Sequence, residues 1–166
     1  MKMGQTITEL KNKVMGSIVF NERIVRAIVI DRPNFLTATP TPEEQDLIDN
    51  PVQLIRTRIF PYIRTLKPTV DNKPYITMQY VNFNKKDKTH YRSGMVYFYV
   101  LCPINIEKTD YGIRYDFILD ELEKVFSEMG IGELEFGNRN DIAINDESQY
   151  IGCSISFNII DFYGVE

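Results

Sequence analysis

Residues 148–162 have the sequence SQYIGCSISFNIIDF, in which every second position from Ile151 to Ile159 is apolar. A period of two is typical of a β-strand that turns one face toward a core and the other away from it. The residues on the second face are small and neutral, where a solvent-facing sheet usually carries Lys, Glu or Thr: Gly152, Ser154, Ser156 and Asn158. The strand therefore raises the question of what this neutral face contacts.

Two further strands are predicted upstream, YITMQYVNF at 75–83 and SGMVYFYVLCP at 93–103, joined by the polar segment 84–92. We expect them to form a β-hairpin with a basic tip. The second of these strands is apolar on both faces, which predicts a central strand that is covered on both sides. Pro103 ends it, because proline cannot donate to a strand ladder.

A long helix is predicted between the hairpin and the last strand. Within 111–130, YGIRYDFILDELEKVFSEMG, apolar residues follow a helical stripe, and Gly130 suits the end of the helix. Its acidic residues are expected on the outer face. The segments GELEF and DIAIND then predict a strand that is interrupted by GNRN at 137–140. The order β-β-α-β-β predicts an α+β fold, with a mainly antiparallel four-stranded sheet and the long helix packed on one face.

The N-terminal part has a different character. Residues 6–19 and 21–30 each carry a helical apolar stripe, and the second helix should stop before Arg32–Pro33. Residues 32–74 are rich in proline and irregular, with one short helix that has Pro42 in its first turn. We therefore predict a single domain over 1–166, with N-terminal helices at 1–31, an irregular segment at 32–74 and the β-β-α-β-β core at 75–162.

The composition is that of an ordinary globular protein, with 43% hydrophobic and 25% charged residues and a net charge of −4. No apolar run has the length of a membrane span or of a signal-peptide core, so we expect no membrane contact and assembly in a cytoplasm. The charge is uneven: residues 1–100 hold 15 basic and 9 acidic residues (+6), and residues 101–166 hold 4 and 14 (−10). If the surface separates these charges, a head-to-tail contact between identical subunits is favoured.

The sequence carries no catalytic signature, so we expect no enzyme, no cofactor and no metal. His90 is the only histidine, and it stands in the polar hairpin tip, where a solvated role is the default. Cys102 and Cys153 lie in apolar runs and are expected to be buried thiols. The oxygen-rich segment NRNDIAINDES lacks the spacing of a calcium loop, and no glycine-rich phosphate loop is present.

Two segments resemble tail-terminator and neck (head–tail joining) proteins of long-tailed bacteriophages: 95–126, MVYFYVLCPINIEKTDYGIRYDFILDELEKVF, and 132–162, GELEFGNRNDIAINDESQYIGCSISFNIIDF. The resemblance consists of a strand and short loop, then Arg114 just ahead of a helix, then a strand, and finally Tyr150-x-Gly152 opening the last strand. It covers 75–162 well and the rest loosely, and the proline-rich segment is longer than such proteins usually have.

This resemblance implies a structural virion protein at the top of the tail that forms a closed homo-oligomeric ring, commonly a hexamer. The ring would cap the tail tube, end its growth and dock it to the head connector on the portal side. Genomic DNA would pass through its lumen without sequence-specific binding. The neutral face of 148–162 would then lie against protein, either the chain's own helices or the next subunit.

Two contact hypotheses follow from charge. The hairpin tip would project and touch the tail tube, the portal side or the DNA; its candidate residues are Lys85, Lys86, Lys88, His90 and Arg92. Subunits would pair a basic group with an acidic helix, and the candidates are Arg56, Arg58 and Arg64 with Asp116, Asp120, Glu121 and Glu123. The alternatives are another head–tail connector or head-completion protein, a small Mg²⁺-dependent phage nuclease, and a host-directed binding module.

Overall fold

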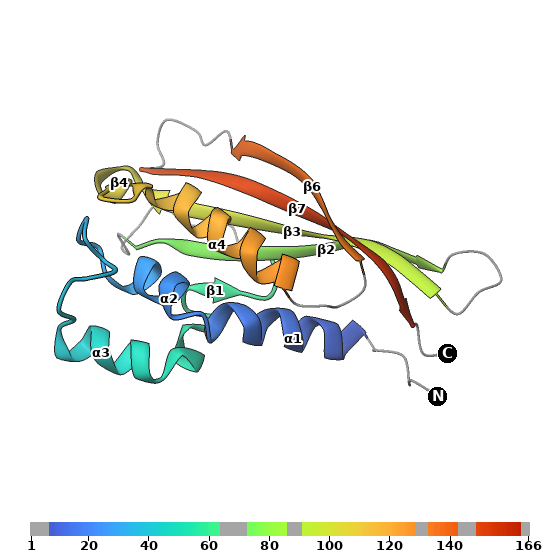
Figure 1. Ribbon diagram of the computed structural model, residues 1–166, viewed down its shortest axis with the longest axis horizontal. Coiled ribbons are helices and arrows are strands. Elements are labelled where there is room, and N and C mark those ends of the chain that lie inside the picture. The colour runs from blue at the N-terminus through green and yellow to red at the C-terminus, as the bar shows by residue number, and fades with distance from the viewer. Residues whose placement is uncertain (1–6, 64–72, 86–90, 129–132, 143–148, 164–166) are drawn as a thin grey trace.

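The computed structural model describes residues 7–63, 73–85, 91–128, 133–142 and 149–163 (Figure 1). Its helices are α1 (Ile7–Val19), α2 (Glu22–Val29), α3 (Pro42–Asp49) and α4 (Arg114–Glu128), with the 3-10 turns η1 (Pro51–Leu54) and η2 (Ile104–Ile106). Its strands are β1 (Ile59–Phe60), β2 (Tyr75–Lys85), β3 (Tyr91–Pro103), β4 (Lys108–Thr109), β5 (Gly112–Ile113), β6 (Glu133–Ile142) and β7 (Tyr150–Tyr163).

The main sheet has the strand order β1-β2-β3-β7-β6. The β2–β3, β3–β7 and β7–β6 pairs are antiparallel, so the predicted α+β fold and its β-β-α-β-β core are confirmed. The predicted four-stranded sheet is incomplete, because β1 adds a fifth strand that runs parallel to β2. The small β4–β5 hairpin just before α4 was also not predicted. Two-residue strands are too short to show a periodicity.

The strand β1 comes from the segment that was predicted to be irregular. After η1 the chain turns at Arg56, whose φ of 68° is left-handed, and it then enters the sheet edge. The backbone N–H of Ile76 donates to the carbonyl of Arg58 at 2.9 Å, and both side chains of β1 are fully buried. This part of the segment is therefore a component of the core.

The described helices cover one face of the sheet: α4 lies in front of the strands in Figure 1, while α1, α2 and α3 line its lower edge. Three phenyl rings join the two layers. Phe126 of α4 lies 4.9 Å from Phe98 of β3 and 4.8 Å from Phe157 of β7, measured between ring centroids. The strand β3 is central, as predicted; on its other face Tyr97 and Tyr99 are only partly exposed, although no described helix packs there.

The N-terminal helices begin and end close to their predicted bounds. Asn21 separates α1 from α2 and caps α2, since its side chain accepts a hydrogen bond from the backbone N–H of Ile24 at 3.1 Å. The two cysteines are buried, as predicted. Burial raises the pKa of Cys102 to about 12 and raises the pKa of Cys153 as well, so both thiols stay protonated at neutral pH.

Two glycines mark places where neighbouring strands approach closely. A Cβ on Gly152 of β7 would collide with the carbonyl oxygen of Val100 and would lie 2.8 Å from the side chain of Leu101. A Cβ on Gly137 would lie 2.6 Å from Oγ of Ser156, at the register shift between β6 and β7. The glycine that opens the last strand therefore lets β7 pair tightly with β3.

We predict that Gly152→Ala destabilises the fold by about 1–3 kcal/mol, because the new methyl group forces a backbone shift in the centre of the sheet. Gly16→Ala is the matched control, since its Cβ would meet nothing closer than 4.0 Å. In the middle of α1 it should stabilise the fold by roughly 0.5–1 kcal/mol. Urea denaturation followed by circular dichroism measures both, and equal stability of the two variants would contradict the prediction.

Candidate interaction surfaces

The sheet face that points away from the described helices carries uncharged side chains on β2, β3 and β7, and we call this three-strand surface the open face. On the register of β2, β3 and β7, its described side chains are Thr77, Gln79, Val81, Met95, Tyr97, Tyr99, Leu101, Ser154, Ser156 and Asn158. The Tyr97 and Tyr99 rings stack along β3, with centroids 6.2 Å apart. The hydroxyl of Tyr99 donates to Oε1 of Gln79 at 3.1 Å. The open face thus combines aromatic rings with neutral polar groups.

The neutral residues of β7 belong to the open face, which answers the question raised by the sequence. The apolar residues of β7 pack under α4, so the neutral ones do not face the described helices. Ser156 and Ser154 are nevertheless only 2% and 8% exposed, because neighbouring strands and side chains enclose them. Oγ of Ser156 accepts from the backbone N–H of Asn138 at 3.1 Å, and Oγ of Ser154 donates to the carbonyl of Asn140 at 3.3 Å. These hydroxyls tie the edge strand β6 to the sheet.

The predicted basic group of the subunit contact is only partly described. Arg56 is exposed at the turn before β1, and Arg64 lies outside the described residues. The guanidinium of Arg58 lies over the ring of Tyr75, 5.5 Å from its centroid, at the β1 side of the open face. Its Nη1 is buried and makes no hydrogen bond to the described part of the chain. Arg58 is therefore a cation at the border of the open face, packed on an aromatic ring.

The predicted acidic group on α4 is largely engaged within the chain. The prediction that Glu121 faces outward is wrong: it is 4% exposed, and its Oε1 lies 2.9 Å from Nε of Arg23 and 3.3 Å from Nζ of Lys124. Asp120 pairs with Arg139 of β6 at 2.6 Å. The helix period had placed Glu121 outside, but α2 approaches this side of α4 and supplies Arg23.

The remaining members of this group are Asp116, which is half-buried, and Glu123, which is exposed. Burial raises the pKa of Asp116, and the nearby carboxylates of Asp120 and Asp141 raise it further against the opposing effect of Arg139. The α4 surface is thus less available to cations of a neighbour than the sequence suggested.

The hairpin tip is described only at its two ends. Lys86, Lys88 and His90 lie outside the described residues. Lys85 and Arg92 are opposite each other in the β2–β3 ladder. The contacts predicted for the tip stay predictions.

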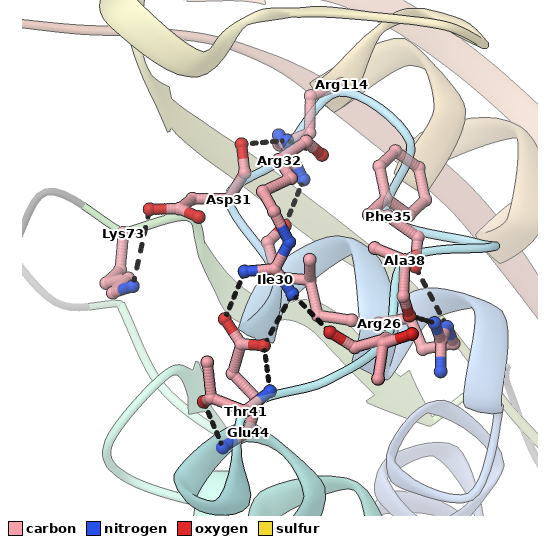
Figure 2. A network of polar contacts seen from close by, with 11 residues as sticks. Arg26, Ile30, Asp31, Arg32, Phe35, Ala38, Thr41, Glu44, Lys73 and Arg114 are labelled. Atoms are coloured by element: carbon pink, nitrogen blue, oxygen red, sulfur yellow. Dashed lines mark hydrogen bonds and ion pairs between the residues drawn. The ribbon is translucent and has the colours of Figure 1, made fainter.

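A buried arginine fixes how α2, the following loop and α4 meet (Figure 2). The side chain of Arg114, the first residue of α4, is fully buried and lies against the ring of Phe35, 4.9 Å from its centroid. Its guanidinium nitrogens donate hydrogen bonds to five backbone carbonyls, with N···O distances of 2.7–3.2 Å: those of Ala27, Ile30, Asp31, Arg32 and Ile106. The Ala27 carbonyl belongs to the last turn of α2, where a cation is favoured by the helix dipole.

Burial lowers the pKa of Arg114, but no carboxylate is needed to hold its charge, because the carbonyl dipoles surround it. The family resemblance singled out Arg114 by its place ahead of the helix. Its role as the clamp of the α2–loop junction could not be foreseen, since four of the five carbonyls it binds lie more than 80 positions earlier in the chain.

Two other arginines hold the loop that leads to α3. Arg26 donates to the carbonyls of Phe35 at 2.9 Å and Ala38 at 2.6 Å. Arg32 binds both carboxylate oxygens of Glu44, at 2.8 and 3.1 Å. Glu44 also completes a capping box with Thr41 at the start of α3. These contacts, drawn in Figure 2, set α3 beside α2.

The described residues contain no group of three His, Cys, Asp or Glu side chains that could hold a metal ion. None of the helices in the described ranges is long and apolar enough to cross a membrane.

A family model described as YomW matches residues 21–159, from the cap of α2 to the core positions of β7. The chain belongs to the YomW family. The name is that of a phage-derived protein, which is compatible with a phage origin and does not define a function. No curated protein and no solved structure gives a significant match to the chain. Both Arg114 and Gly152 lie within the stretch matched by the YomW family.

We predict that Arg114→Met destabilises this YomW-family protein by about 3–5 kcal/mol, because it leaves buried carbonyls without donors. Arg139→Met is the matched control: it removes an exposed ion pair with Asp120 and should cost no more than about 1 kcal/mol. Urea denaturation of both variants gives the comparison. An Arg114→Met protein as stable as the control would show that Arg114 does not hold the junction.

The Glu44 carboxylate predicts a pH dependence of stability. Its burial raises its pKa, but the hydrogen bonds from Arg32 and from the Thr41 backbone outweigh this, so its pKa is lowered from 4.5. The stabilisation is therefore complete above the unfolded-state pKa and is lost as the pH falls through the lower folded-state pKa.

Glu44→Gln should accordingly lower the free energy of unfolding by roughly 1 kcal/mol at pH 7, while Gln keeps the capping interaction. At pH values well below 4.5 the variant and the wild type should become equally stable. Arg32→Gln should reduce the same pH-dependent difference and leave the part that comes from the Thr41 backbone. A gap between wild type and Glu44→Gln that persists unchanged in acid would contradict this assignment.

Proposed function

We propose that this chain is a structural virion protein of a tailed phage, which forms a homo-oligomeric ring, a hexamer, at the head–tail junction. The ring caps the completed tail tube and docks it to the head connector, while DNA passes through the lumen. The open face carries this proposal: its described side chains on β2, β3 and β7 are uncharged, and the described helices leave it uncovered. Membership of a family with a phage-derived name supports a phage setting.

The size and chemistry of the open face suit a protein partner. Strands spaced about 4.8 Å apart and rising about 3.3 Å per residue give, over about ten residues of β2, β3 and β7, roughly 500 Å². A standard protein interface buries about 800 Å² on each side and is enriched in tyrosine and poor in charge at its centre. A surface for nucleic acid would instead carry Lys and Arg for the phosphates. We assign the open face to the contact with the tail tube.

A nuclease role is less well supported by the carboxylates that are described. A Mg²⁺ site needs carboxylates whose oxygens are free to bind the ion. On α4, however, Asp120 is held by Arg139 and Glu121 by Arg23 and Lys124. These carboxylates act as internal ion-pair partners, which favours a structural role for the helix.

The first test is the solution mass of the full chain over a wide concentration range, alone and with purified tail tubes, by native mass spectrometry and light scattering. We expect a discrete closed ring that binds to tube ends. Binding to purified connectors but not to tubes would assign the chain to the connector or head-completion proteins. A monomer that forms no ring with either partner would contradict the proposal.

A variant tests the open face within the same experiment. Tyr97→Glu places a charge beside Ser156 in the centre of the open face. Capture by tail tubes should fall at least tenfold, because binding would bury this charge in the interface without a partner. Ser127→Glu adds the same charge at an exposed position of α4 and should bind as the wild type does. Equal capture of both variants would remove the open face from the contact.

A further inference from the structure

A second surface lies on the helical side of the molecule, away from the open face. A hollow of about 420 Å³ opens where the end of α1, the start of α2 and the end of α3 meet. Its walls combine apolar side chains with two carboxylates, and its principal residues are Phe20, Val25, Ile48, Pro51, Glu22 and Asp49.

The apolar part of the hollow is unusually exposed. Phe20 is 71% exposed, more than any other large hydrophobic residue of the described chain, and Val52, next to Pro51, is 57% exposed. The backbone N–H of Phe20 still donates to the carbonyl of Gly16 at 3.0 Å, so the residue is held on the last turn of α1. A large aromatic side chain held in this way beside a hollow is typical of a protein contact.

The helices around the hollow carry exposed acidic residues, of which Glu22 and Asp49 line the hollow itself. The α3 sequence, PEEQDLID, contains no basic residue. Its carboxylates Glu43, Asp46 and Asp49 are exposed, as is Glu22 at the start of α2. None of the four forms an ion pair within the described part of the chain, whereas Asp120 and Glu121 of α4 do. The hollow therefore combines exposed apolar side chains with carboxylates that form no ion pair within the described part of the chain.

The chain carries a segment with the opposite charge. Residues 85–92, KKDKTHYR, hold Lys85, Lys86, Lys88 and Arg92 against a single acid, Asp87, together with the aromatic Tyr91. β2 ends at Lys85 and β3 begins at Tyr91, and these strand ends lie at the opposite end of the long axis from α3 (Figure 1). The segment that joins them starts too far away to serve the hollow of its own chain.

We propose that the hollow binds the 85–92 segment of a second copy of this chain, with the basic residues facing the carboxylates of Glu22 and Asp49. The two surfaces differ and lie at opposite ends of the molecule, so the contact is head-to-tail. Repetition of such a contact closes a ring or continues as a filament. The inference rests on the ring proposed above and names the contact that builds it, leaving the open face for the tube.

Charge reversal on the full chain tests this contact. Glu22→Lys with Asp49→Lys changes the hollow, and Lys86→Glu with Lys88→Glu changes the segment. Each double variant should raise the concentration needed for half-assembly by roughly tenfold at low salt, and the effect should shrink as salt screens the charges. Asp110→Lys with Asp141→Lys, at exposed positions elsewhere, is the control with the same charge change and should assemble as the wild type does.

A mixture of the two double variants tests whether the hollow and the segment contact each other. An equimolar mixture of the hollow variant and the segment variant should assemble within about threefold of the wild type, because each unlike neighbour restores opposite charges. The mixed ring should contain the two proteins in equal numbers, which native mass spectrometry shows when one of them is labelled with a heavy nitrogen isotope. Phe20→Ser should also weaken assembly while leaving the melting temperature unchanged, since the ring of Phe20 is mostly outside the core.

Several results would overturn the contact. Wild-type assembly of either double variant would do so, and so would a loss that mixing does not restore. A segment variant that forms normal rings but fails to bind tubes would assign residues 85–92 to the tube and would leave the proposed ring function standing. A wild-type chain that stays monomeric at every concentration and on tail tubes would reject both the contact and the ring.

Discussion

The position of the helices relative to one another depends on one buried guanidinium. Arg114 binds backbone carbonyls at the end of α2, in the loop that follows and in η2, so a single side chain joins three parts of the chain that share no strand or helix. A buried charge is costly unless its surroundings solvate it, and here the carbonyl dipoles take the place of water. Because α4 begins at Arg114, the same contacts also set where the long helix starts to cross the sheet.

The same principle extends along the irregular segment toward α3. Proline-rich chain cannot satisfy its carbonyls by regular pairing, and exposed loops usually leave them to water. Here Arg26 and Arg32 donate to carbonyls between Phe35 and Thr39, and Arg32 also binds Glu44 at the start of α3. The arginines thus replace the missing secondary structure.

The sequence predicted the elements in which a periodic pattern extends over many residues. It did not predict the features that depend on individual tertiary contacts. The alternation around Ile155 and the helical stripe that ends at Phe126 placed β7 and α4 correctly, because each pattern extends over several turns or pleats. The strand Ile59–Phe60 was missed because two residues have no period. Glu121 was assigned to the wrong side, since the approach of Arg23 depends on tertiary packing that no local pattern encodes. The hollow was missed for the same reason, as its walls come from separate helices.

The two cysteines have a consequence for the chemistry of the chain as a whole. Both sulfurs are buried, and burial raises the pKa of each thiol, so the reactive thiolate is scarce at neutral pH. Oxidants and disulfide exchange act through accessible thiolates. The folded protein can therefore pass from a reducing to an oxidising environment without a covalent change at sulfur.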